Sequence, residues 1–236
     1  MGLRTFLGLR KPGVAKAAVL AAEARTAAIV VPPDLDSWFS GKEFSQDWLS
    51  SKIVHWFAAL EAQRDLPAEI LEVGSFEGRS AIAFLSYLPR SHITCVDTFA
   101  LEDVTQKMDG NLIEQRFDRN LAPFGERVTK IKGNASTALD GLRTDAKTYD
   151  IVYLDAGKKR DWIFVLSALA WPLLRVGGVM IWDDLKWGRG KPDADRPESA
   201  IRLFCSAFSS CLDVVYEDRQ MIVRKTSDWP VGQQGG

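Results

Sequence analysis

Three aspartates stand at the ends of two apolar runs, where their carboxylates could act together on a cation. Asp155 closes the run that begins at Tyr149, and Asp183 and Asp184 close the run that begins at Gly178. A segment of helix length separates the runs, and a right-handed βαβ unit can place such strand ends side by side. Adjacent strands lie about 4.8 Å apart, and open α/β sheets bind ligands at this edge. Oxygen ligands suit Mg²⁺, Ca²⁺ or Mn²⁺, so the pattern indicates a divalent metal site.

A second interpretation gives the same aspartates separate roles. Aspartates in turns commonly hydrogen-bond their own backbone or face solvent. Asp155 would then cap a turn or contact a cofactor, whereas Asp183 and Asp184 would be solvated or would cap a helix. The sequence leaves both interpretations open.

A glycine turn precedes this cluster in the chain. Gly74 and Gly78 follow a strand-like run and open a helix-like one, where glycine permits a tight turn and close approach of a ligand to the backbone. The dinucleotide fingerprint is GxGxxG, but here the spacing is GxxxG and Phe76 fills the second position. Asp97 ends the next strand-like run, where a carboxylate can accept both hydroxyls of a ribose. The pattern favours a nucleoside ligand over NAD; a purely structural turn is the alternative.

The elements that must position these residues alternate in type along the chain. Such alternation predicts a parallel sheet with crossover helices. The expected parallel strands are Glu69–Gly74, His92–Asp97, Val128–Gly133, Tyr149–Asp155 and Gly178–Asp183. The expected helices are Ser80–Leu88, Leu112–Leu121, Asp161–Leu174 and Glu198–Phe208. Two further runs, Leu212–Glu217 and Gln220–Arg224, are close enough to form an antiparallel hairpin at the edge of the sheet.

The N-terminal part is expected to be helical. An apolar stripe predicts a helix over Ser45–Glu61, packed on the main domain; its members are Leu49, Ile53, Trp56, Phe57 and Leu60. Residues 1–30 are basic and rich in alanine, which suits a solvated or partner-packed helix better than a membrane-surface one. The predicted organisation is an N-terminal helical extension (1–44), a main domain (45–226) with a lid-like helix at 45–62, and a disordered tail (227–236).

The composition limits the classes of binding partner that the protein is expected to have. The chain has 236 residues, 46% hydrophobic and 26% charged, as in an ordinary soluble domain. Thirty Lys and Arg nearly balance thirty-one Asp and Glu, so no overall field attracts nucleic acid. The three cysteines form no CxxC, and no apolar run reaches the roughly 18 residues of a membrane span. We expect a cytoplasmic protein with a small-molecule partner and no transmembrane segment; a homo-oligomer is left open.

Several of these motifs together resemble the class I S-adenosylmethionine-dependent methyltransferases. The resemblance extends from about Trp48 to Lys225 and includes Glu72, the glycine pair and Asp97. EILEVGSFEGRS at 69–80, TCVDTF at 94–99, WPLLRVGG at 171–178 and FSQDW at 44–48 are similar to a group of small bacterial methyltransferases. The resemblance implies an α/β, Rossmann-like, doubly wound sheet of seven mostly parallel strands with an antiparallel last strand.

The resemblance also implies a set of cofactor-binding residues. Gly74, Ser75, Phe76 and Gly78 are expected near the methionine part of S-adenosylmethionine. Glu72, Ser80 and Asp155 are also expected to bind the cofactor. Asp97 is expected at the ribose, and the residues around the adenine are Thr98, Phe99, Asn134 and Ala135.

DAGK at 155–158 and DDLKW at 183–187 are similar to the catechol and caffeoyl-CoA O-methyltransferases. That resemblance implies that Asp155, Asp183 and Asp184 hold Mg²⁺ or another divalent cation and that Lys158 is the base, with Asp155 also catalytic. Asp184 stands where those families usually have asparagine, and a double aspartate resembles the metal site of certain antibiotic-sugar O-methyltransferases. Lysine titrates near 10.4, so Lys158 needs burial or an adjacent cation to act as a base. Without a metal, an ion pair with the aspartates is expected.

The leading hypothesis is therefore an enzyme that methylates a small polar acceptor, such as a sugar or a phenol, on oxygen with the help of a divalent metal. The alternatives are a metal-independent methyltransferase, in which Lys158, His55 or solvent ionises the substrate, and a non-catalytic nucleoside-binding or scaffold protein. His55 is otherwise expected to be a packed or surface residue.

Overall fold

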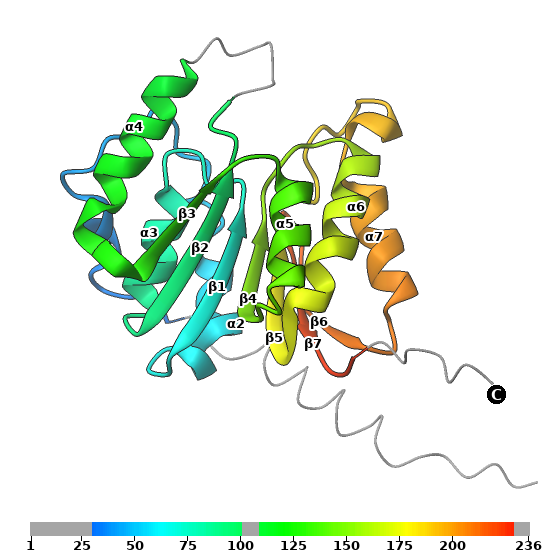
Figure 1. Ribbon diagram of the computed structural model, residues 1–236. Coiled ribbons are helices and arrows are strands. Elements are labelled where there is room, and N and C mark those ends of the chain that lie inside the picture. Colours follow the sequence, from blue (N-terminus) through cyan, green and yellow to red (C-terminus); the bar gives the residue numbers. More distant parts are fainter. Residues whose placement is uncertain (1–29, 101–108, 229–236) are drawn as a thin grey trace, which may run out of the picture.

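The computed structural model describes residues 30–100 and 109–228 (Figure 1). Its centre is a seven-stranded sheet of order β3-β2-β1-β4-β5-β7-β6. The strands are β1 (Ala68–Val73), β2 (Ser91–Asp97), β3 (Val128–Lys132), β4 (Tyr149–Leu154), β5 (Leu174–Trp182), β6 (Leu212–Glu217) and β7 (Met221–Lys225). β1 to β5 are parallel, and β7 runs antiparallel between β5 and β6. The Rossmann-like prediction, including the hairpin and the antiparallel last strand, is confirmed.

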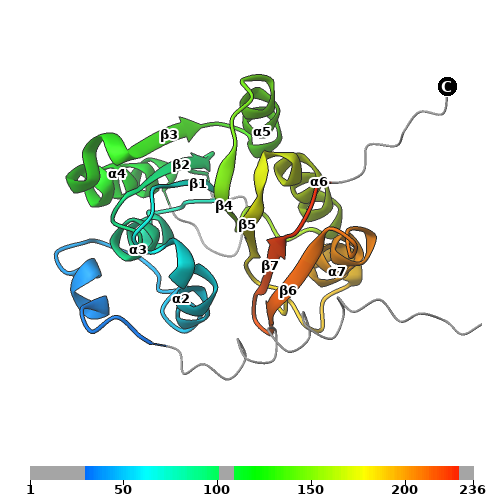
Figure 2. The same ribbon diagram turned by 90° about the horizontal axis from the view of Figure 1, so that it is seen from below.

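Two layers of helices cover the sheet (Figure 2). α2 (Val54–Leu60), α3 (Arg79–Tyr87) and α4 (Gly110–Leu121) lie over one face, and α5 (Ala135–Thr144), α6 (Arg160–Ala170) and α7 (Glu198–Ala207) lie over the other. Each face has its own apolar core. Because both faces are covered, the central strands are buried on both sides, as their continuous apolar sequences predict.

Several expected element boundaries are wrong, and one α-helix was not expected. The helix predicted over Asp161–Leu174 ends at Ala170, and β5 begins at Leu174, because a short 3₁₀ turn at Trp171–Leu173 feeds directly into the strand. α5 was not predicted: its apolar side is short, and Gly141, Ser136, Thr137 and Asp140 lower the helix propensity of the segment. Asn134 begins α5 by accepting hydrogen bonds from the amides of residues 136 and 137.

The helix predicted over Ser45–Glu61 is also too long, because α2 begins only at Val54. The preceding residues 42–53, here called the strap, form turns. Asp47 Oδ1 accepts the amides of Leu49 (3.2 Å) and Ser50 (3.0 Å), which bends the backbone out of a helical path. The amide of Ser45 donates to Glu77 at 2.6 Å. Local and long-range hydrogen bonds therefore override the apolar periodicity, although every residue of the stripe is buried.

The terminal predictions are tested only in part. Residues 1–29 and 229–236 lie outside the described residues, as do most of the expected N-terminal extension and tail. Between residue 30 and the strap there is one short 3₁₀ helix, Leu35–Phe39. In the part of the chain that the structure describes, every helix is too short or too polar to cross a membrane.

Candidate active site

The glycine turn joins β1 to α3 at the carboxyl edge of the sheet. Gly74 has φ +93° and Gly78 has φ +82°, a backbone region that glycine occupies without strain. A Cβ on Gly74 would lie 2.5 Å from the carbonyl oxygen of Asp155. The backbone of Asp155, at the end of β4, therefore occupies the space that a side chain on residue 74 would need. The glycine turn and the backbone of Asp155 therefore pack against each other.

Asp97 holds the turn in shape from the end of β2. Its Oδ2 accepts the amides of Ser75 and Phe76, each at 2.7 Å, and its Oδ1 accepts the amide of Phe99 at 2.6 Å. A carboxylate has about four lone-pair directions, so one remains for a further donor. Asp97 thus organises the backbone of two loops.

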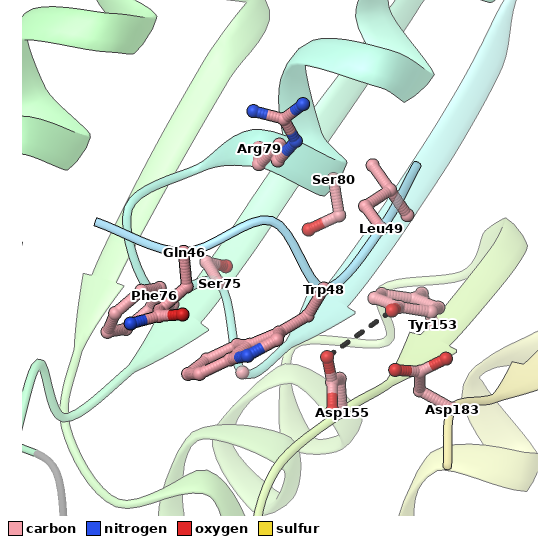
Figure 3. Close-up of a pocket in the computed structure, with 11 residues that line it drawn as sticks. Gln46, Trp48, Leu49, Ser75, Phe76, Arg79, Ser80, Tyr153, Asp155 and Asp183 are labelled. Carbon is pink, nitrogen blue, oxygen red and sulfur yellow. Dashed lines mark hydrogen bonds between the residues drawn. The ribbon is translucent and has the colours of Figure 1, made fainter. Parts of the chain in front are cut away.

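A pocket opens between the glycine turn, the end of β4 and the strap (Figure 3). The empty space between these residues is about 400 Å³, a figure that includes its open mouth. Trp48 lies across it between Phe76 and Asp155, and its ring centroid is 5.2 Å from that of Phe76. The lining residues are Gln46, Trp48, Leu49, Gly74, Ser75, Phe76, Arg79, Ser80, Tyr153, Asp155 and Asp183. The pocket therefore brings the glycine turn and two of the three aspartates into one space.

The three predicted metal ligands converge. Asp155, Asp183 and Asp184 each offer an oxygen, and these atoms lie within 4.8 Å of one another. The side chain of Asp183 is 1% exposed. Asp184 has φ +58°, a region that aspartate and asparagine enter more readily than most residues. Aspartate therefore suits the backbone conformation of residue 184.

Two lysines neutralise part of this cluster. Lys158 Nζ contacts Asp155 Oδ1 at 2.6 Å and Asp184 Oδ2 at 2.5 Å. Lys52 Nζ, which comes from the strap, contacts Asp183 Oδ2 and lies 3.3 Å from Asp184 Oδ1. Lys158 thus forms an ion pair with two of the three aspartates.

The pKa values of the cluster reflect burial and mutual charge. Burial, and then the neighbouring aspartates, raise the pKa of Asp183 to about 7. Burial also raises the pKa of Asp155. For Asp184, burial opposes the shift, but Lys158 and Lys52 lower its pKa overall. Burial lowers the pKa of the Lys158 ammonium, yet Asp155 and Asp184 raise it by more, so this lysine retains its proton in the arrangement described.

Some predicted cofactor residues lie behind the pocket rather than on its wall. Glu72 is fully buried; it accepts hydrogen bonds from Ser80 Oγ and, at 3.4 Å, from Cys95 Sγ, and burial raises its pKa to about 7. Phe99 is buried against Phe117, with ring centroids 5.0 Å apart. The Asn134 side chain caps α5.

Two other predicted residues lie elsewhere. Ala135 packs in the core under α5. His55 stacks on Tyr216 of β6 at 3.9 Å, and burial, with Arg219, lowers its pKa. This placement fits the expectation of a packed histidine.

Sequence reasoning missed the parts of the site that other elements supply. Lys52 and Gln220 reach Asp183 from the strap and from the turn before β7; Gln220 Nε2 donates to Asp183 Oδ1 at 2.6 Å. Tyr153 Oη donates to Asp155 Oδ2 at 3.3 Å. The motif FSQDW lies in the strap. No local sequence pattern predicts that Lys52 contacts Asp183, which lies 131 positions further along the chain.

Comparison with known proteins gives the site a context. Residues 71–185, from the glycine turn through the aspartates, match a family described as "Methyltransferase domain". An O-methyltransferase of Aspergillus hancockii, hkm8, is 28% identical over 124 residues, which are 51% of this chain and 45% of that protein. The chain therefore spans about half the length of this curated relative.

Solved structures share the fold. MycE methyltransferase from the mycinamycin biosynthetic pathway, in complex with Mg, SAH and mycinamycin VI, superposes with a TM-score of 0.56 and 17% identity. The superposition covers 84% of this chain and 54% of MycE. An O-methyltransferase from Bacillus cereus in complex with SAH superposes with a TM-score of 0.53 and 16% identity. That superposition covers 93% of this chain and 92% of the Bacillus cereus chain.

Proposed function

We propose that this chain, which carries a class I S-adenosylmethionine-dependent methyltransferase domain, methylates a hydroxyl oxygen of a small polar molecule with the help of a divalent metal ion. The acceptor classes are sugars, phenols and similar metabolites. One observation carries the proposal: the glycine turn and two of the three clustered aspartates, Asp155 and Asp183, border the same pocket. A methyl donor held at the turn would thus lie beside an acceptor held at the cluster.

The proposed cofactor site follows the carboxyl edge of β1 and β2. Gly74, Ser75, Phe76 and Ser80 offer the pocket wall for the methionine part. Asp97 offers its remaining lone pair to the ribose, and fixes the turn through the three amides that it accepts. S-adenosylmethionine supplies a methyl group on a positively charged sulfur. The chain's contribution is to align that group with the acceptor, and proximity of this kind contributes roughly 7–11 kcal/mol to catalysis.

The aspartate cluster fits a hard divalent cation. Its donor atoms are all carboxylate oxygens, which Mg²⁺ and Mn²⁺ prefer as ligands. Two ammonium groups already pair with these carboxylates, so the cluster attracts positive charge. MycE was solved with Mg and a bound ligand in the same fold. Asp155, Asp183 and Asp184 would hold the ion, which when bound lowers the pKa of a coordinated hydroxyl.

Asp155 and Lys158 are the proposed catalytic residues. Asp155 lines the pocket and Lys158 contacts it at 2.6 Å, so the proton of an acceptor hydroxyl bound at Asp155 would have a path to Lys158. Lys158 accepts that proton only if its pKa falls, which requires additional positive charge close to the cluster.

A metal-independent methyltransferase is the second candidate, and the two lysines favour it. Lys52 and Lys158 already touch all three aspartates, so the cluster has countercharge without any ion. In that case the ammonium groups would orient the acceptor hydroxyl by hydrogen bonding.

An assay of methyl transfer tests both candidates. The purified protein is incubated with S-adenosylmethionine and a panel of catechols, sugar glycosides and aliphatic alcohols, with Mg²⁺ or with EDTA, and products are identified by mass spectrometry. Methylation that EDTA abolishes and Mg²⁺ restores supports the metal-assisted reaction. Equal turnover in EDTA supports the second candidate, and no methylated product across the panel while the protein binds the cofactor would favour a non-catalytic role.

A further inference from the structure

Lys52 is buried in the aspartate cluster although it belongs to the strap, outside the segment that matches the methyltransferase domain. Its side chain is 9% exposed, and that of its partner Asp183 is 1% exposed. A buried ammonium is stable only when it is paired, and here two aspartates pair with it. Lys52 is therefore part of the site's charge balance.

The charges of the cluster leave no place for a divalent ion while both lysines remain. When all three carboxylates are ionised, they face two ammonium groups among the described residues, so the cluster then has one net negative charge. Addition of a divalent ion would reverse that to one net positive charge in a largely buried space. Withdrawal of one ammonium group would restore neutrality, so a metal ion and one of the lysines should exclude each other.

The hydrogen bonds indicate which lysine must leave. Both oxygens of Asp183 are engaged: Oδ2 by Lys52 and Oδ1 by Gln220. Gln220 is fixed from its other end as well, because its Oε1 accepts Trp56 Nε1 at 3.1 Å. Of the two donors to Asp183, Lys52 is the charged one, and it lies in a segment of turns. Lys52 is therefore the lysine that must leave.

Asp155 is less constrained than Asp183. Among the described residues, Lys158 holds its Oδ1 at 2.6 Å and Tyr153 donates to its Oδ2 at the longer distance of 3.3 Å. Lys52, by contrast, bridges Asp183 Oδ2 and Asp184 Oδ1, so a cation that binds these two oxygens together must take the position of its ammonium group.

We propose that the Lys52 ammonium occupies the cation position on Asp183 and Asp184, and that a divalent ion binds there only when Lys52 withdraws. Lys52 is thus a built-in competitor of the metal and a determinant of metal affinity. The inference rests on the metal-assisted form of the proposed function.

Titration of the full-length protein with Mn²⁺ tests this competition. Lys52→Met removes the competing charge and should bind Mn²⁺ at least tenfold more tightly than the wild type. The matched control is Lys42→Met, which removes the same charge from the same strap, where the ammonium donates to the carbonyl of Asn120 instead. The control should bind Mn²⁺ as the wild type does. Equal or weaker Mn²⁺ binding by Lys52→Met, or none by either protein, would overturn the proposal.

A second variant and a second readout cover the case in which Lys52→Met folds poorly. Lys52→Arg keeps the positive charge and should bind Mn²⁺ no more tightly than the wild type; a tenfold gain would contradict the proposal. Mn²⁺ should also raise the melting temperature of Lys52→Met more than that of the wild type, because tighter binding stabilises the folded state more. An equal or smaller rise would contradict it.

Titration with S-adenosylhomocysteine separates this inference from the proposed function. If the wild type does not bind that compound, the methyltransferase proposal fails, while the Mn²⁺ comparison still decides the role of Lys52. If the compound binds and Lys52→Met gains no Mn²⁺ affinity, only the inference about Lys52 fails.

Discussion

Replacement of Gly74 by alanine should destabilise the domain, because the end of β1 packs against the end of β4 and leaves no space for a side chain at residue 74. The new Cβ would lie 2.5 Å from the carbonyl oxygen and 2.6 Å from the carbonyl carbon of Asp155. Both are backbone atoms of the loop that presents the aspartate, so they move only with the end of β4.

Two costs add in this variant. The left-handed backbone at φ +93° costs an alanine about 1–2 kcal/mol, and overpacking against a rigid neighbour costs about 1–3 kcal/mol. The expected loss in free energy of unfolding is therefore roughly 2–5 kcal/mol.

Urea unfolding of Gly74→Ala and a matched variant measures that loss. Gly133→Ala is the control, because a Cβ on Gly133 meets no atom within 4 Å and its φ is not positive. The control should change stability by less than about 0.5 kcal/mol. If Gly74→Ala were equally harmless, the close approach of β1 and β4 described above would be wrong.

Three further predictions concern the cofactor side and the core. Burial raises the pKa of Glu72 from 4.5 to about 7, so the folded state binds the proton of this carboxyl more tightly than the unfolded state does. The stability that this proton contributes is therefore lost as the pH rises from 4.5 to 7. Urea unfolding should show wild-type stability falling by roughly 3 kcal/mol relative to Glu72→Gln over that interval; a pH-independent difference would contradict it. Asp97→Ala leaves three amides without their acceptor and should weaken S-adenosylhomocysteine binding at least tenfold by calorimetry, whereas unchanged affinity would argue against the clamp. Leu139→Ala in α5, which is fully buried, should lose about 2–5 kcal/mol in urea unfolding, well above the loss for the partly exposed Leu112→Ala; similar losses would refute the packing of α5.

The strand pattern is largely predictable from the sequence, because strands covered on both faces are continuous apolar runs. Ile70 and Ile151, for example, are fully buried at paired positions of β1 and β4. The order of the parallel strands also places Asp155 and Asp183 at neighbouring ends, so their convergence follows from topology.

Contacts that depend on distant packing were not predictable in the same way. The strap is bent because the amide of Leu49 donates to Asp47 and the amide of Ser45 donates to Glu77. Hydrophobic periodicity does not reveal these hydrogen bonds. The arrival of Lys52 at Asp183 depends on that bend.

The glycine turn shows a similar limit. Its backbone conformation follows from Gly74 and Gly78, but the identity of the neighbour that fills the space at Gly74 became evident only in three dimensions.

The central claim is that the pocket between the glycine turn and Asp155 binds S-adenosylmethionine. Isothermal titration of the full-length protein with this compound tests the claim most directly. The account predicts saturable binding of one molecule per chain, displaced by S-adenosylhomocysteine and weakened in Asp97→Ala. Absence of binding heat together with failure to compete for a bound nucleoside, or saturable binding of NAD in its place, would contradict it.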